Sequence, residues 1–132
     1  MAQRELAHIG YVVRSMASAL KRFARDGAIV RVPPTDDPFQ RVTCCLLDLD
    51  GAAIELVAPL GDDSPVAGRI SRGGGLDHLC FYVDDIDSAL AEERLAGGVV
   101  VCEPVHAVTF NTRIAFIHRK TGLVVELMER IA

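Results

Sequence analysis

The sequence repeats itself, and this duplication constrains the fold more than any other feature. Residues 6–13 read LAHIGYVV and residues 76–83 read LDHLCFYV, so that His78 falls on His8 at an offset of 70. Both stretches are apolar and rich in β-branched residues, which favours a strand in each copy. Repeats this short cannot bury a hydrophobic face alone, so we expect the two copies to pack together.

A second echo lies near the end of each copy. Residues 54–57 read IELV and residues 125–128 read VELM, so that Glu126 falls on Glu55 at an offset of 71. Each copy therefore carries one histidine early and one glutamate late.

The first copy reads as βαβββ. Ser15 is a suitable N-cap for a helix that has one apolar face and stops at Gly27. The prolines within residues 33–38 predict a loop there, and Asp50-Gly51 predicts a tight hairpin. The expected strands are 7–13, 29–32, 42–49 and 53–57.

The second copy repeats this pattern after a linker. Ser64-Pro65 predicts the start of a short helix that runs to about Arg72 and is followed by a flexible triple glycine. The next helix begins at Asp84-Asp85, stops at Gly97-Gly98 and directs side chains to the core. Those side chains are Ile86, Ala89, Leu90 and Leu95, and we expect strands at 76–83, 99–102, 113–117 and 123–128 with a loop or irregular edge at 103–112.

The length of 132 residues fits one domain. We expect a single domain over residues 1–132, with module one at 6–59, a linker helix within 60–75 and module two at 76–130. The expected class is α+β, with the two βαβββ modules forming a cupped mixed sheet.

Charge and composition narrow the choice of partners. The net charge of -4 gives no reason to expect a nucleic-acid partner, and no apolar run approaches the length of a membrane span. The four cysteines form no CxxC pair and lie in apolar runs, as reduced buried thiols do. No signal peptide is evident, so we expect a cytoplasmic protein.

The repeated histidine and glutamate indicate a metal site. A glutamate inside an apolar strand is costly unless it is paired or binds a metal, and here that cost occurs twice at equivalent positions. The imidazoles of His8 and His78 and the carboxylates of Glu55 and Glu126 suit one divalent ion of Mn, Co, Ni, Fe or Zn. Four protein ligands leave open positions, as in catalytic sites.

Several motifs together resemble the vicinal oxygen chelate superfamily over about residues 6–129. This superfamily includes glyoxalase I, methylmalonyl-CoA epimerase, extradiol dioxygenases and bleomycin-resistance proteins, and the resemblance is greatest to the epimerases. It rests on His8-Ile9-Gly10, Ile54 to Leu60, Asp63 to Ala67, Asp77 to Cys80, Val83 to Ile86, Phe116 to His118 and Val124 to Leu127.

The resemblance implies a site and a reaction. It implies that His8, Glu55, His78 and Glu126 bind the metal, around which the paired modules form their cupped sheet. It also implies proton transfer at a carbon next to a carbonyl or thioester, with Glu126 or Glu55 as the base and a small molecule such as an acyl-CoA as substrate. Superfamily members commonly form homodimers, which we expect here too.

Two departures from the epimerase pattern affect the substrate pocket. Cys44 stands where some epimerases carry an acidic candidate base. The stretch 106–112 replaces a glycine-rich loop, which makes Asn111 and Thr112 candidates for substrate binding together with Arg113 and Cys44. An epimerase-like isomerase is the leading hypothesis, and the alternatives are a glyoxalase I-like lyase and a small-molecule-binding or resistance protein.

Overall fold

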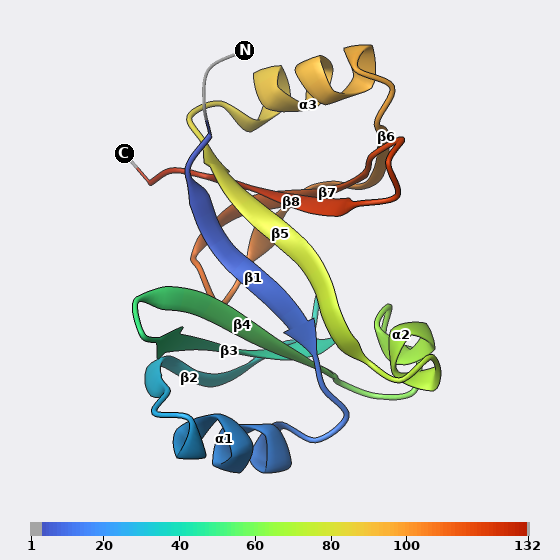
Figure 1. Cartoon of the computed structure of the whole chain (residues 1–132). Helices are drawn as coiled ribbons and strands as arrows, with labels where there is room; N and C mark the ends of the chain where they lie inside the picture. The colour runs from blue at the N-terminus through green and yellow to red at the C-terminus, as the bar shows by residue number, and fades with distance from the viewer. Residues whose placement is uncertain (1–3, 132) are drawn as a thin grey trace. The chain divides into compact units, whose positions relative to one another are not determined.

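The computed structural model describes residues 4–131, and within them the chain forms the order βαβββ twice around a short connecting helix (Figure 1). The first module contains β1 (Leu6–Val12), α1 (Met16–Arg25), β2 (Ile29–Asp37), β3 (Val42–Leu49) and β4 (Ala52–Pro59). The connecting helix is α2 (Ala67–Ser71). The second module contains β5 (Gly75–Val83), α3 (Ile86–Leu95), β6 (Val99–Ala107), β7 (Thr112–His118) and β8 (Val124–Glu129).

The chain divides into two compact units that nearly coincide with the modules. One unit is formed by residues 8–77, and the other by the residues from His78 onward together with those before His8. The strands follow the order β2-β3-β4-β1 in the first module and β5-β8-β7-β6 in the second. In each module one pair is parallel, β1 with β4 and β5 with β8, and the remaining pairs are antiparallel. The predicted α+β class with two βαβββ modules is confirmed.

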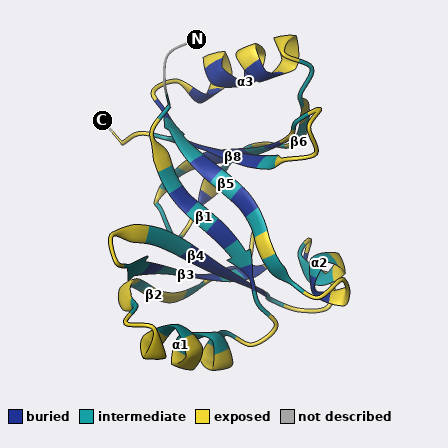
Figure 2. Ribbon diagram, viewed as in Figure 1, coloured by how far each residue is buried: buried dark blue, intermediate teal, exposed yellow. Residues whose placement is uncertain are grey.

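Helix α1 covers one face of the first module (Figure 1). The Ser15 side chain accepts a hydrogen bond from the Ser18 N–H at 3.2 Å, which confirms the predicted N-cap. The apolar face of the helix packs on Cys45, Leu47 and Leu56. No residue of α1 is buried, so the side chains of its apolar face remain partly exposed (Figure 2).

Helix α3 covers the equivalent face of the second module and is buried more deeply (Figure 2). Ile86, Ala89 and Leu90 pack against strands β7 and β8 as predicted. The helix begins at the predicted place, and the Asp85 side chain caps it by accepting a hydrogen bond from the Ser88 N–H. The prediction that Leu95 faces the core is wrong, because this side chain is 90% exposed. At about 100° per residue, Leu95 lies half a turn away from Ile86 on the opposite side of the helix.

Strands β2 and β6 extend further than predicted. Residues 33–37 were expected to form a loop and residues 103–107 a loop or an irregular edge. Each stretch continues a strand that carries two register shifts, so the loop prediction is wrong for 33–37 and the irregular edge is confirmed for 103–107. Each of these strands stands at one end of its module's strand order, where a proline removes no hydrogen bond from a central ladder. The prolines are therefore compatible with these strands, whose pairing is irregular but does not end there.

The linker also differs from its prediction. Helix α2 is shorter than expected, and its N-cap is Val66 and not Ser64. At Gly74, which has a φ of +68°, an added Cβ would lie 2.8 Å from the Val12 carbonyl oxygen. This glycine is thus required by a close approach of two backbone segments. No helix within residues 4–131 has the length and apolar character of a membrane span.

A buried carboxylate on α3 binds two arginines from other segments of its compact unit. Glu93 on α3 accepts hydrogen bonds from Arg4 at 2.5 Å and from Arg119 at 3.0 and 3.1 Å. The Arg119 guanidinium also lies 5.8 Å from the centre of the Phe81 ring. Burial by itself would raise the pKa of Glu93, but the hydrogen bonds and charges of Arg119 and Arg4 outweigh it and lower that pKa.

We predict that Glu93→Gln destabilises the protein by about 3 kcal/mol at pH 7, because it leaves two arginines without their buried counter-charge. Since the folded-state pKa of Glu93 is lowered, its stabilising effect is present above the unfolded-state value of about 4.3 and is lost as pH falls through the folded value. Urea denaturation at pH 7 and at pH 3.5 measures both effects.

The matched control is Glu103→Gln, which removes an exposed partner of Arg94. We expect this variant to retain wild-type stability and pH dependence. A Glu93→Gln protein that loses as much stability on acidification as the wild type would contradict the role given to Glu93.

Candidate metal centre

The backbone register brings His8 and Glu55 together in the first module. Strands β1 and β4 are parallel, and Gly10 pairs with Glu55. Because side chains alternate along a strand, His8 points to the same face as position 10 and therefore to the face that carries Glu55. His8 Nε2 lies 3.2 Å from Glu55 Oε1, and both side chains are buried.

The second module reproduces this arrangement. Strands β5 and β8 are parallel, and Cys80 pairs with Glu126. His78, two residues before Cys80, reaches the face that carries Glu126, and its Nε2 lies 3.0 Å from Glu126 Oε1. Both of these side chains are buried as well.

The donor set fits a divalent metal. Each pair supplies one buried imidazole and one buried carboxylate, which are donors that such an ion accepts. Neighbouring ligands of one ion with bonds of about 2.1 Å lie about 3 Å apart when they meet at right angles. The nitrogen–oxygen distance within each pair is close to this spacing, so the two atoms of a pair are placed to bind an ion as neighbouring ligands.

On strand β3, the neighbour of the first pair is an aliphatic side chain. Leu46 is the residue of β3 that pairs with Glu55. Cys44 points to the same face and lies in a cluster with Val12, Val57 and Ile70. The thiol at this candidate substrate position is therefore packed among apolar side chains of its own module.

The surroundings of the second pair include an aromatic ring. Phe116 is the residue of β7 that pairs with Glu126, and its ring meets the His78 imidazole edge to face, with centroids 5.3 Å apart. Cys102 pairs with Phe116 on the next strand. Burial, followed by the charges of Glu126 and Glu103, raises the pKa of the Cys102 thiol. Sequence reasoning missed the contact of Phe116 with His78, because only the hairpin register reveals it.

The other three candidate substrate residues lie at and after the turn between β6 and β7. Asn111 is exposed and has a φ of +54°, and its N–H donates to the Ala107 carbonyl. The Thr112 hydroxyl donates to the Glu129 carbonyl at 2.8 Å. The Arg113 guanidinium binds Glu129, whose other contact is the first N–H of α3. Within their own module, all three are thus engaged at the end of the hairpin.

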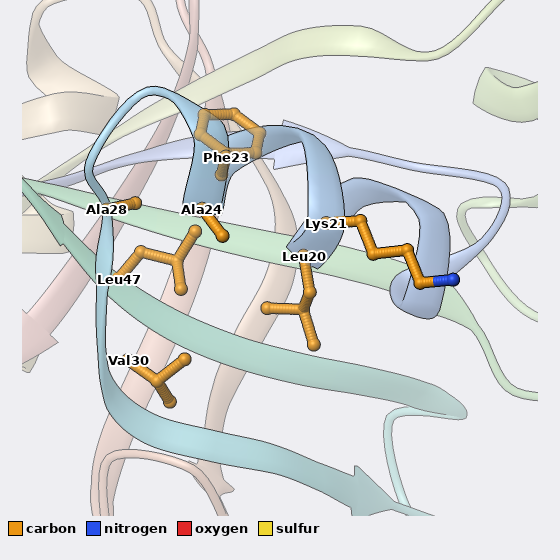
Figure 3. Close-up of a pocket in the computed structure, with 7 residues that line it drawn as sticks. All are labelled: Leu20, Lys21, Phe23, Ala24, Ala28, Val30 and Leu47. Carbon is orange, nitrogen blue, oxygen red and sulfur yellow. The ribbon is translucent and has the colours of Figure 1, made fainter.

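Two pockets lie within single modules, and neither contains a candidate metal ligand. One has a volume of about 300 Å³ and lies between α1, β2 and β3 (Figure 3). Its walls are apolar apart from Lys21, and Leu47 on its floor points away from the face that carries Glu55. The other, of about 270 Å³, lies between the start of α3 and Arg130.

Comparison with known proteins agrees with this geometry. Residues 7–116 match the family model of the glyoxalase/bleomycin resistance protein/dioxygenase superfamily. Over 127 residues the chain is 30% identical to an ethylmalonyl-CoA/methylmalonyl-CoA epimerase of Cereibacter sphaeroides, covering 92% of this chain and 95% of that protein.

Two solved epimerase structures are similar over almost the whole chain. The methylmalonyl-CoA epimerase of Mycobacterium tuberculosis has a TM-score of 0.83 at 30% identity, covering 96% of this chain and 88% of that one. A methylmalonyl-CoA epimerase variant of Streptomyces coelicolor in complex with 2-nitronate-propionyl-CoA has a TM-score of 0.85 at 27% identity, covering 99% of this chain and 100% of that one. The chain belongs to the glyoxalase/bleomycin resistance protein/dioxygenase superfamily, also called the vicinal oxygen chelate superfamily. Its named relatives are methylmalonyl-CoA epimerases at about 30% identity.

We predict that excess Co²⁺ raises the melting temperature of the chelator-treated protein, because an ion bound only by the folded state stabilises it by about 4 kcal/mol at 1,000 times its Kd. His8→Ala and His78→Ala should each lose most of this shift. Differential scanning calorimetry with and without Co²⁺ measures it.

His118→Ala is the control, since this histidine is exposed at the end of β7. It should respond to Co²⁺ as the wild type does. Wild-type shifts in both His8→Ala and His78→Ala would show that the two pairs do not bind metal.

Proposed function

We propose that this protein is a divalent-metal-dependent epimerase that moves the proton on the carbon next to a thioester carbonyl. The observation that carries the proposal is the buried histidine–glutamate pair that occurs in each module. The relatives named above support methylmalonyl-CoA, or an acyl-CoA of similar size, as the substrate.

In this proposal the two modules form one domain, and both pairs bind a single ion of Co, Mn, Ni, Zn or Fe. His8, Glu55, His78 and Glu126 would hold this ion, and the substrate carbonyl would bind to it as well. A bound ion acts as a Lewis acid that polarises the carbonyl and makes the neighbouring C–H more acidic. Calorimetric saturation at one ion per chain is the outcome that this sharing requires.

The proton is moved by the carboxylates of the chain. Epimerisation breaks the C–H bond on one face of the carbon, and its electron pair moves into the carbonyl group as a carboxylate oxygen takes the proton. The other configuration results when a proton returns to the opposite face, so two acid–base groups are needed. We assign these roles to Glu55 and Glu126, because Cys44, at the third candidate position, is packed among aliphatic side chains.

We predict that the Co²⁺-loaded protein exchanges the α-hydrogen of methylmalonyl-CoA for deuterium in D₂O and interconverts the two epimers. Glu55→Gln and Glu126→Gln should each lower the rate about 100-fold or more, as removal of a general acid–base group does. Mass spectrometry and proton NMR of the product measure exchange.

The chelator-treated protein is the control and should be inactive until Co²⁺ is restored. Absence of deuterium at the α-carbon with fully metal-loaded wild-type protein rejects this substrate.

A glyoxalase I-like lyase is the second candidate, and Glu55 is the observation that favours it. Both pairs here are histidine with glutamate, as expected of glyoxalase I from the resemblance, whereas some epimerases carry glutamine at the position of Glu55. The chemistry is again proton transfer next to a carbonyl.

The glutathione hemithioacetal of methylglyoxal separates the two functions. We predict that the Co²⁺-loaded protein leaves the hemithioacetal unchanged at enzyme concentrations that complete the exchange of methylmalonyl-CoA. Ultraviolet absorbance of the thioester product measures the reaction of the hemithioacetal. Rapid thioester formation without acyl-CoA exchange would reverse the ranking.

A further inference from the structure

We propose that Phe116 is a positioning residue that fixes the orientation of the His78 imidazole for metal binding. The inference rests on the metal site of the proposed function and names a determinant of that site within the second module. Phe116 makes no hydrogen bond through its side chain, so it acts through packing alone.

The geometry of the ring contact supports this role. The two ring planes stand at 90° with centroids 5.3 Å apart, which is the edge-to-face arrangement that aromatic pairs prefer. The His78 side chain rotates about two bonds, and both must be fixed for its Nε2 to point toward a metal ion. A ring packed perpendicular to the imidazole restricts that rotation while leaving Nε2 at 3.0 Å from Glu126.

The strand register places Phe116 beside both members of the pair. It is the cross-strand neighbour of Glu126 on β7, and its ring also touches His78 on β5. Phe116 is partly buried and packs against the apolar cluster of Cys80, Ala107, Ile114 and Met128. This cluster supports the ring from one side, and the ring in turn lies beside the two candidate ligands.

The first module provides an internal comparison. Leu46 occupies the equivalent place there, since it pairs with Glu55 as Phe116 pairs with Glu126. The two modules thus present the same donors at nearly the same spacing, 3.2 and 3.0 Å, but different walls. Phe116→Leu gives the second module the wall of the first and leaves every metal donor in place.

We predict that Phe116→Leu weakens Co²⁺ binding about two- to tenfold, which is the range that corresponds to one edge-to-face aromatic contact. It should also change the visible absorption spectrum of bound Co²⁺, because that spectrum reports ligand geometry. Phe116→Tyr keeps the ring and should restore both properties. Isothermal titration calorimetry and absorption spectroscopy on folded protein measure them.

Phe81→Leu is the matched control. Phe81 is also partly buried in the second module, but it packs with the α3 core and beside Arg119. Its replacement removes the same atoms and should lower stability without changing Co²⁺ affinity or spectrum. Wild-type affinity and spectrum in Phe116→Leu, or equal weakening in Phe81→Leu, would overturn the inference.

The outcome is distinguishable from failure of the proposed function. Metal affinity and spectrum require no substrate, so they test Phe116 even where acyl-CoA exchange is absent. A wild-type protein that binds no Co²⁺ overturns the positioning role. A wild-type protein that binds Co²⁺ but exchanges no α-hydrogen overturns the epimerase function alone.

Discussion

The pairing of a buried glutamate with a buried histidine is the interaction on which this structure depends. An ionised carboxylate inside a sheet is strongly unfavourable unless a charge or hydrogen-bond donor compensates it. In each module two parallel strands in one particular register bring the histidine within reach of the carboxylate. A slip of one residue would turn Glu55 or Glu126 toward the face covered by a helix. The polar pairs therefore specify the same register as the alternating apolar residues around them.

The two modules share the βαβββ order but use different side chains to pack the two faces of their strands. On the helix-covered face, α1 is held by half-buried apolar contacts, whereas α3 is held by a buried core and by Glu93 with its two arginines. On the opposite face, Leu46 lies beside the histidine–glutamate pair of the first module and Phe116 beside that of the second. The two modules thus carry the same candidate metal donors and differ in the residues that surround those donors.

The sequence predicted what periodicity and repetition encode. His8, Glu55, His78 and Glu126 stand out because the repeat aligns them, and Ser15 and Asp85 are visible as caps before apolar helical patterns. Strand ends were less predictable: Pro33 and Pro34 lie on a terminal strand, where irregular pairing keeps the backbone extended. The contact of Phe116 with His78 depends on the exact pairing of β7 with β8 and on a side-chain orientation. A loop one residue longer would change that pairing without altering the apolar pattern, so periodicity does not contain this information.

The place of Cys44 bears on how proton transfer is divided in the proposed reaction. The linker helix contributes Ile70 to the cluster of apolar side chains in which this buried thiol lies. Cys44 is not acidic, so the proposed reaction assigns the acid–base roles to carboxylates that would also serve as metal ligands. One such carboxylate belongs to each module, and epimerisation requires one group for each face of the carbon. In the proposed reaction, the duplication that repeats the candidate metal ligands would therefore also supply the two groups that carry the proton.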